Sequence, residues 1–341
     1  MKQFITIGLA LGIIFTNAFG SKALIRQLER LSVGQPISYR NLTIFPLSTK
    51  DYDRTTDYLT LDQAMRKGYM TITEQASAQV NHLWVENTSR SFVFLMSSEL
   101  VAGCKQDRMV ANDCLLGPQS GRIDLQVYCT EHGRWTSEGS NFKSLDAAAH
   151  LSMRQVAKES KSQQEVWDEV RSKAGALAVT PAPTMALKSV IGGKEVAERC
   201  QPYKDKLAGI PGLGRDVVGV AVACGDAIIC IDVFANPSLF KSLWPKLLNS
   251  YVLDVVDRSS DRCHIGQRDV ERALDAAAGA DFQRGTTDGL GQSWEFRSGR
   301  ASGSALLYRD RLVHCDIFPS PAQNIDDEST PRLDYRRGKV H

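Results

Sequence analysis

The chain has 341 residues, of which 43% are hydrophobic and 23% are charged, and its formal net charge at pH 7 is +2. A chain of this length can bury the core of one large domain or two ordinary ones. The charge is nearly balanced and no basic stripe carries interleaved aromatic residues, so nucleic acid is excluded as an expected partner.

The first residues have the pattern of a secretory signal peptide. Lys2 supplies a short basic region, an apolar run follows from Phe4 to Phe19, and Ala18 and Gly20 offer small residues for cleavage. The run is shorter than the roughly 18 to 20 residues that a spanning helix needs, which favours cleavage over an uncleaved membrane anchor. We therefore expect an exported protein, periplasmic or secreted, with no membrane association after cleavage.

Closely spaced apolar segments between turn residues predict a β-rich region of the sandwich or barrel type over residues 24–140. Ile123–Cys129 alternates strictly and predicts a half-buried strand. Residues 97–99 are expected to turn a hairpin between two apolar strands. Thr60 is expected to cap a short helix that ends at Gly68.

The pattern becomes helical over Ser144–Lys173, with Ser144 as the expected N-cap. Further helices are predicted over Val190–Leu207, Pro237–Val256 and Arg268–Ala278. The glycine-rich residues 209–214 have no following Lys-Ser or Lys-Thr, which argues against a phosphate-binding loop.

An internal repeat occupies the C-terminal part of the chain. GVAVACGDAIICIDVF (219–234) matches GSALLYRDRLVHCDIF (303–318) without a gap. Each copy predicts a hairpin that turns at Asp226 or Asp310. Helices between the two copies then predict a pseudo-symmetric α+β unit.

The fold class expected from these patterns is α+β, with a β-rich N-terminal domain followed by the pseudo-symmetric unit. The expected divisions are a signal peptide (1–23), a β-rich domain (24–140), a helical connector (141–210), an α+β domain (211–320) and a disordered tail (321–341).

An even number of cysteines in an exported chain favours disulfide bonds, although buried free cysteines pack equally well as small apolar groups. The eight cysteines are Cys104, Cys114, Cys129, Cys200, Cys224, Cys230, Cys263 and Cys315. Cys104 with Cys114 is the first expected pair, because both flank one short segment between strands.

Two motifs carry a family resemblance. A Glu-x-x-x-Gly-x-Lys-Gln-x-Arg pattern is met by Glu99, Gly103, Lys105, Gln106 and Arg108, and a Cys-x-Glu-x-Gly-Arg-Trp pattern by Cys129, Glu131, Gly133, Arg134 and Trp135. With segments such as NLTIFPL (41–47), they resemble the ARG- and rhodanese-phosphatase-superfamily-associated protein domain, a bacterial family, from Arg40 to Phe318. The family name records genomic association rather than chemistry, so the resemblance implies no particular reaction. The chain departs from the family pattern in its Ser97-Ser98 turn and in its export signal.

The charged residues of these motifs support three interpretations. They form a structural ion-pair network, or they bind an anionic ligand, or they catalyse a reaction on one. The expected ligand-binding residues are Lys105, Gln106, Arg108 and Arg134, and the candidate general bases are Glu99 and Glu131.

Asp232 and Asp316 hold equivalent positions in the repeat. They either meet as a carboxylate pair or, as is commoner for Asp after a hairpin, cap the segment that follows. The Cys and His residues lack paired zinc spacing, and no serine-hydrolase elbow or His-Glu-x-x-His motif occurs, so neither a metal nor a cofactor is expected.

Two functions follow from these patterns. The first is an exported binding or interaction module that takes a small anionic ligand or a partner protein. The alternative is a hydrolase or transferase in which Glu99 or Glu131 acts as base while Lys105, Arg108 and Arg134 hold an anionic substrate.

Overall fold

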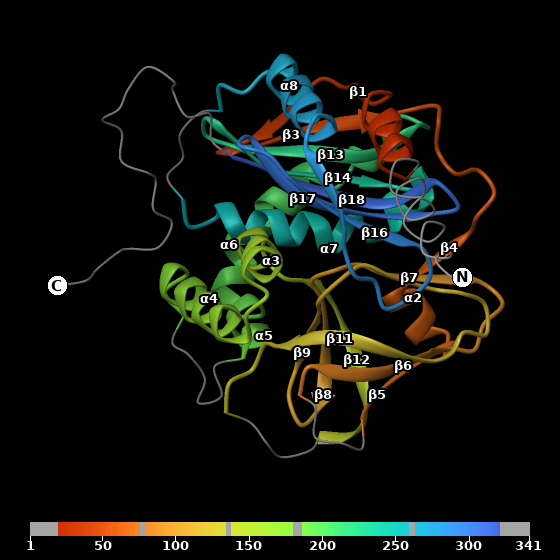
Figure 1. The fold of residues 1–341 in the computed structure, drawn as a ribbon. Coiled ribbons are helices and arrows are strands. Elements are labelled where there is room, and N and C mark those ends of the chain that lie inside the picture. Colours follow the sequence, from red (N-terminus) through yellow and green to blue (C-terminus); the bar gives the residue numbers. More distant parts are fainter. Residues whose placement is uncertain (1–19, 76–79, 134–137, 180–185, 259–262, 321–341) are drawn as a thin grey trace, which may run out of the picture.

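The computed structural model describes residues 20–75, 80–133, 138–179, 186–258 and 263–320. These ranges form a mixed α+β fold that contains a nine-stranded sheet, a three-stranded sheet and a closed barrel, with helices around and between them (Figure 1). The predicted α+β fold class is therefore confirmed. Of the expected signal peptide (1–23), residues 1–19 lie outside the described residues and residues 20–23 belong to a helix, while the whole expected tail (321–341) lies outside them.

The large sheet is antiparallel throughout and has the order β1-β3-β13-β14-β18-β17-β16-β15, with β2 also paired to β3. Its strands are β1 (Ser32–Val33), β2 (Ile37–Tyr39), β3 (Leu42–Ser48), β13 (Val217–Cys224), β14 (Ala227–Phe234), β15 (Asp281–Arg284), β16 (Gln292–Arg297), β17 (Ala301–Tyr308) and β18 (Arg311–Pro319). β13–β14 and β17–β18 are both hairpins, and β14 lies beside β18 at the centre of the sheet.

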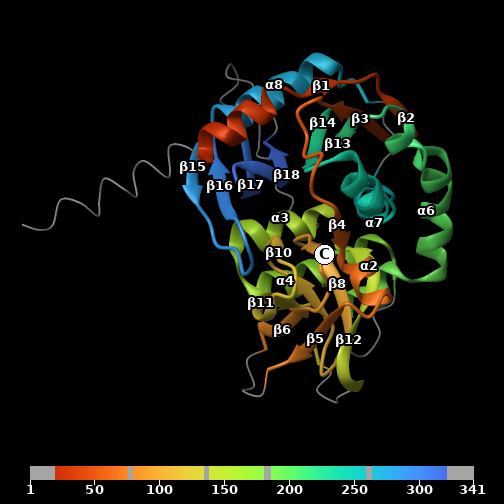
Figure 2. The same cartoon turned by 90° about the vertical axis from the view of Figure 1, so that its right-hand side faces the viewer.

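Both faces of this sheet are covered, which explains why its central strands are apolar at almost every position. On one face, Ala221 and Ile231 pack with α8 (Gln267–Ala278) and with a helix over residues 20–28. On the other face, Val222 packs against α7 (Pro237–Val255). Figure 2 shows the sheet between these two layers.

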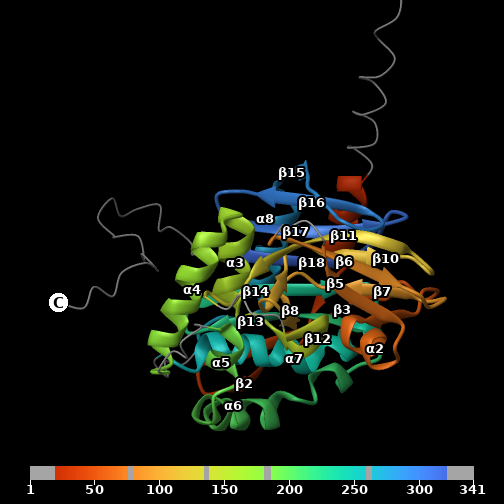
Figure 3. The ribbon, with the colours of Figure 1, turned by 90° about the horizontal axis from the view of Figure 1, so that it is seen from below.

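The closed barrel has the order β11-β6-β5-β12-β8-β9 and lies below the large sheet in the view of Figure 1. Figure 3 looks at the molecule from that side, with the barrel in front of the sheet. Its strands are β5 (Met70–Glu74), β6 (His82–Asn87), β8 (Glu99–Cys104), β9 (Arg108–Val110), β11 (Gly121–Cys129) and β12 (Glu138–Ala148). Alternate residues such as Val85, Leu125 and Val127 form its apolar interior, as the period-two pattern of a half-buried strand requires.

The expected hairpin at residues 97–99 is wrong. β7 (Phe92–Leu95) pairs with β4 (Tyr58–Thr60) and β10 (Cys114–Leu116) in the three-stranded sheet, whereas β8 enters the barrel. The connection is fixed by two backbone contacts, from Ser97 N to the Asp113 carboxylate at 2.8 Å and from Ser98 N to Val110 O at 2.8 Å. The turn residues therefore transfer the chain between two sheets.

The expected helix start at Ser144 is also wrong, because residues 144–148 belong to β12 and pair with β8. The helical part divides into α3 (Leu151–Ser160), capped by His150, and α4 (Gln163–Ala176), capped by Ser162. The later helices are α5 (Leu187–Ile191), α6 (Lys194–Leu207), η1 (Ile210–Gly212), α7 and α8. No helix within the described ranges is long and apolar enough to cross a membrane.

The expected boundaries at residues 140 and 210 stay a prediction. The large sheet takes β1, β2 and β3 from the first expected range and the rest of its strands from the last. Strands distant in sequence therefore share one sheet.

The expected disulfide bonds are wrong. All eight cysteines lie within the described residues, none of them forms a disulfide bond there, and seven of them are buried. Cys104 and Cys114 lie on β8 and β10, which belong to different sheets, and both side chains pack in the apolar interior of the barrel region. They behave as small apolar groups, the alternative that the sequence left open.

The predicted cap at Thr60 is confirmed, since its hydroxyl accepts from Gln63 N and the Gln63 side chain accepts from Thr60 N before α2 (Leu61–Arg66). We expect Thr60→Ala to lower the free energy of unfolding by about 1 kcal/mol, because this capping box loses its side-chain acceptor. Urea unfolding measures the change. Thr60→Ser keeps the hydroxyl and should stay close to wild type, and an equal loss in both variants would contradict the cap's role.

Candidate functional site

Two aspartates, Asp232 and Asp316, meet at the centre of the large sheet. Asp232 on β14 and Asp316 on β18 are directly opposite each other in the strand register, and both are fully buried. Each lies within its strand, so the expectation that they cap following segments is wrong. Two adjacent buried carboxylates require positive charge nearby.

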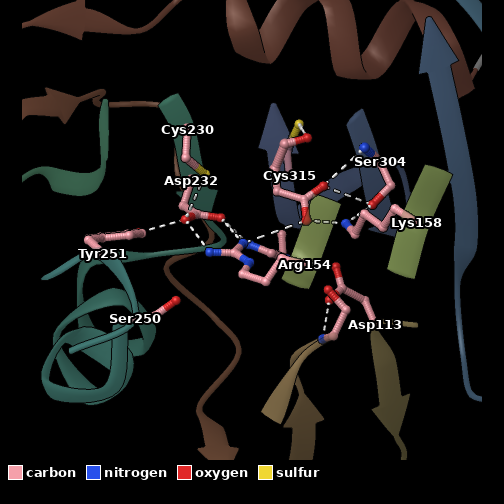
Figure 4. A network of polar contacts seen from close by, with 12 residues as sticks. Asp113, Arg154, Lys158, Cys230, Asp232, Ser250, Tyr251, Ser304 and Cys315 are labelled. Atoms are coloured by element: carbon pink, nitrogen blue, oxygen red, sulfur yellow. Dashed lines mark hydrogen bonds and ion pairs between the residues drawn. The ribbon is translucent and has the colours of Figure 1, made fainter. Parts of the chain in front are cut away.

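Arg154, on α3, supplies that charge. Its guanidinium donates to Asp232 Oδ2 at 3.0 Å and to Asp232 Oδ1 at 2.6 Å, and its Nη2 lies 3.6 Å from Asp316 Oδ2. Burial by itself raises the pKa of Asp232, but Arg154 outweighs it and holds that pKa well below its usual range. In Figure 4, Arg154 points at Asp232 across the space between α3 and the sheet. The contact is a bidentate, fully buried ion pair.

His314 links this pair to a third carboxylate. Its Nδ1 lies 2.7 Å from Asp113 Oδ2 and its Nε2 lies 3.2 Å from Asp232 Oδ1. Burial lowers the pKa of His314, but the two carboxylates outweigh burial and raise it to about 9. Both ring nitrogens therefore donate, and His314 is an imidazolium at neutral pH.

Lys158, one turn after Arg154 on α3, binds the second aspartate. Its ammonium forms an ion pair with Asp316 and donates to Ser304 Oγ at 2.5 Å. Ser304 in turn donates from its hydroxyl to Asp316 Oδ1 at 3.0 Å. Figure 4 shows Lys158 and Ser304 pointing at one another.

The charges of this network balance. Three cations, Arg154, Lys158 and His314, face three carboxylates, Asp113, Asp232 and Asp316. We call these six side chains the buried charge network.

A cleft of about 770 Å³ lies beside the buried charge network. Its walls come from the barrel, from α3 and from strands β15 to β17 of the large sheet, and Asp113, Lys158 and Ser304 belong to its lining. Ser97 also lines it, is 2% exposed, and has an Oγ that finds no hydrogen-bond partner within the described part of the chain. A buried hydroxyl that lacks a partner beside a cleft is suited to meet a ligand atom there.

The network favours binding over nucleophilic chemistry. A serine attacks when a neighbouring group accepts its proton. Ser304 donates its hydroxyl to Asp316, but that carboxylate is already held in an ion pair by Lys158, which also donates to Ser304 Oγ and is a fixed cationic donor. The side chains at the cleft are held in place by buried partners, which is the arrangement of a preorganised binding site.

The structure brings together three of the residues predicted from the motifs, away from this cleft. Gln106 accepts from Arg108 Nη1 at 3.2 Å and donates to Glu131 O at 3.1 Å. The side chains of Gln106, Arg108 and Glu131 are at most 2% exposed. Nearby, Lys188 lies 3.0 Å from Asp107 Oδ2. The predicted roles of these residues in binding an anion stay predictions.

The other motif residues lie elsewhere. Glu99 is fully buried and meets Lys246 of α7 at 2.5 Å, and burial, only partly offset by Lys246, raises the pKa of Glu99 to about 7. The half-exposed Lys105 lies 3.7 Å from Glu74. Arg134 falls outside the described residues. Glu99 and Lys105 therefore do not converge on one point.

Sequence reasoning missed Arg154, Lys158, His314 and Asp113 as members of one site. A signal existed for the first two, because Arg154 and Lys158 are four residues apart on one helical face within an apolar pattern. No comparable signal marks Asp113, which lies in the connection just before β10, far from the other members in sequence. Within the described residues, no group of three His, Cys, Asp or Glu side chains is arranged to hold a metal ion.

Comparison with known proteins identifies the family. A family model described as the ARG and Rhodanese-Phosphatase-superfamily-associated Protein domain matches residues 30–318. No curated protein and no solved structure matches the chain. The matched range includes both motifs and every member of the buried charge network. The chain belongs to the ARG and rhodanese-phosphatase-superfamily-associated protein domain family.

Proposed function

We propose that this is an exported binding module that takes a small polar ligand in the cleft between the barrel and the large sheet. The observation that carries the proposal is the charge-balanced buried network, which fixes Lys158 and Asp113 in the wall of a cleft of about 770 Å³. The volume falls within the usual range for small-molecule sites. Export rests on the signal-peptide pattern of the first residues.

The proposed symmetry of the α+β unit supports this location. If the hairpins β13–β14 and β17–β18 are repeats, their pairing through β14 and β18 sets the equivalent Asp232 and Asp316 opposite each other. The repeat then places two carboxylates where one helix, α3, can bind both through Arg154 and Lys158. The site would be a product of the duplicated hairpin.

Catalysis by Glu99 or Glu131 is the less supported alternative. Glu99 is fully buried and closed off by Lys246, and Glu131 is 2% exposed. Neither side chain lines the cleft. A general base must come within hydrogen-bonding reach of its substrate, and these carboxylates lie where a substrate has no approach.

A thermal-shift screen over sugars, amino acids, nucleotides and sugar phosphates tests the proposal. We expect at least one compound class to raise the melting temperature of wild type, as a ligand that binds only the folded state must. The shift should fall in Ser97→Ala/Ser304→Ala, which removes two hydroxyls from the cleft. It should persist in Ser172→Ala, a matched exposed change on α4.

Lys105→Ala distinguishes a ligand bound in the cleft from a ligand bound at the motif residues. A shift that is lost in Lys105→Ala and kept in Ser97→Ala/Ser304→Ala would move the ligand to the motif residues. No shift with any compound would refute the small-ligand function.

A further inference from the structure

The charged side chains that line the cleft are largely paired with opposite charges. Lys158 is bound to Asp316, Asp113 to His314, and Lys161 lies 2.9 Å from Glu295. A site that binds an anion presents more cationic and hydrogen-bond-donating groups than carboxylates and other acceptors. Arg297 also lines the cleft, but the three lining cations, Lys158, Lys161 and Arg297, are outnumbered by four lining carboxylates, Asp113, Glu159, Asp281 and Glu295. The cleft therefore has no surplus positive charge to offer.

Neutral polar groups make up much of the remaining lining. Five carboxamide and six hydroxyl side chains face the cleft. A carboxamide both donates and accepts, as does a hydroxyl. Hydrogen bonds to neighbouring side chains orient several of these carboxamides. Asn112 donates to Gln126 Oε1 at 3.2 Å, and Gln155 donates to Glu159 at 2.9 Å. Such a lining is complementary to a ligand with many groups that each donate and accept hydrogen bonds.

An aromatic side chain adds a partly apolar surface. Tyr128, on β11, is half-buried, lines the cleft, and is fixed by a hydrogen bond from its hydroxyl to Ala157 O at 3.2 Å. A ring with one polar end offers a rigid apolar surface beside hydrogen-bonding groups. A sugar ring has the complementary form, with C–H faces and a rim of hydroxyls.

From the paired charges, the carboxamide and hydroxyl lining and the ring of Tyr128, we infer that the ligand is a neutral polyhydroxylated molecule, an oligosaccharide. This inference rests on the proposed function and names its ligand class. Lys158, Asp113 and the Ser97 hydroxyl, which has no partner among the described residues, would each bond a ligand hydroxyl. An ammonium donates to a hydroxyl oxygen and a carboxylate accepts from a hydroxyl, and neither hydrogen bond needs charge on the ligand.

Isothermal titration calorimetry with maltotriose, cellotriose and triacetylchitotriose tests the inference, with glucose 6-phosphate and citrate as anionic probes. At least one neutral trisaccharide should bind, and its affinity should change by less than about twofold when the salt concentration is raised, because no charge is screened. Gln283→Leu removes a cleft carboxamide at the exposed strand β15 and should weaken binding roughly three- to tenfold. Gln201→Leu, on α6 away from the cleft, should leave it unchanged.

The outcomes separate the two proposals. If the anionic probes bind, the trisaccharides do not, and Ser97→Ala weakens the binding, the cleft is a ligand site and the inference about its class is overturned. Equal affinities in wild type and Gln283→Leu would also overturn it. If no probe of either class binds, and the thermal-shift screen finds none, the binding function itself fails.

Discussion

Replacing Arg154 by methionine should lower the free energy of unfolding by about 3–5 kcal/mol, the cost of removing one partner from a buried ion pair. The side chain is 1% exposed, and without its guanidinium Asp232 loses two hydrogen bonds while it faces Asp316 across the strands. Methionine retains much of the side-chain volume, so the loss reports mainly on charge. Chemical denaturation with urea gives the value.

Two further variants test whether the lost ion pair causes the loss of stability in Arg154→Met. Arg171→Met removes an exposed arginine that pairs with Asp168 on α4, and this change should cost less than about 0.5 kcal/mol. Asp232→Asn combined with Arg154→Met should be less destabilising than the sum of the single changes, by about 1–3 kcal/mol, because the unpaired charge is then gone. Additive costs would show that Arg154 acts through packing and not through Asp232.

The sequence predicted the meeting of Asp232 and Asp316 only as one of two alternatives. The proposed repeat assigns them equivalent positions, but strand pairing between β14 and β18 is a tertiary contact that no local pattern encodes. Arg154 lies in a segment predicted to be helical, and an arginine on a helix is usually solvated. Its burial depends on where α3 packs.

The motif residues show the opposite case, in which proximity in sequence did not mean proximity in space. Glu99 begins β8, and Lys105 follows the end of that strand. A six-residue strand spans about 20 Å, so the two ends face different surroundings. Glu99 meets α7, whereas Lys105 lies at the opposite end with Glu74. One motif therefore contributes to two clusters.

The error at Ser144 has a similar origin. Residues 144–148 precede a true helix and share its small apolar residues, so the helical pattern extends back through them. Pairing of Ser144 with Val101 and of Ala148 with Glu99 holds this segment in β12 instead. Tertiary pairing overrides a weak local propensity, whereas the Thr60 cap, a local contact, was predicted correctly.

The stability of the protein should fall by about 2 kcal/mol between pH 7 and pH 9 because of His314. The folded-state pKa, about 9, lies above the ordinary value of 6.5, so the folded protein binds more protons than the unfolded chain between these values. The stabilisation is complete below pH 6.5 and is lost as the pH rises through 9. Urea unfolding at a series of pH values across this window measures the slope.

His314→Gln tests whether the imidazolium is the source. This variant should be less stable than wild type at pH 7, because Asp113 and Asp232 lose a shared cation, and its stability should change little from pH 7 to 9. His264→Gln, which alters an exposed histidine beside Asp226, should keep the wild-type slope. The slope is the decisive quantity, because any damaging change can lower stability, whereas only loss of the titrating group removes its pH dependence. A slope that survives in His314→Gln would place the titrating group outside the buried charge network.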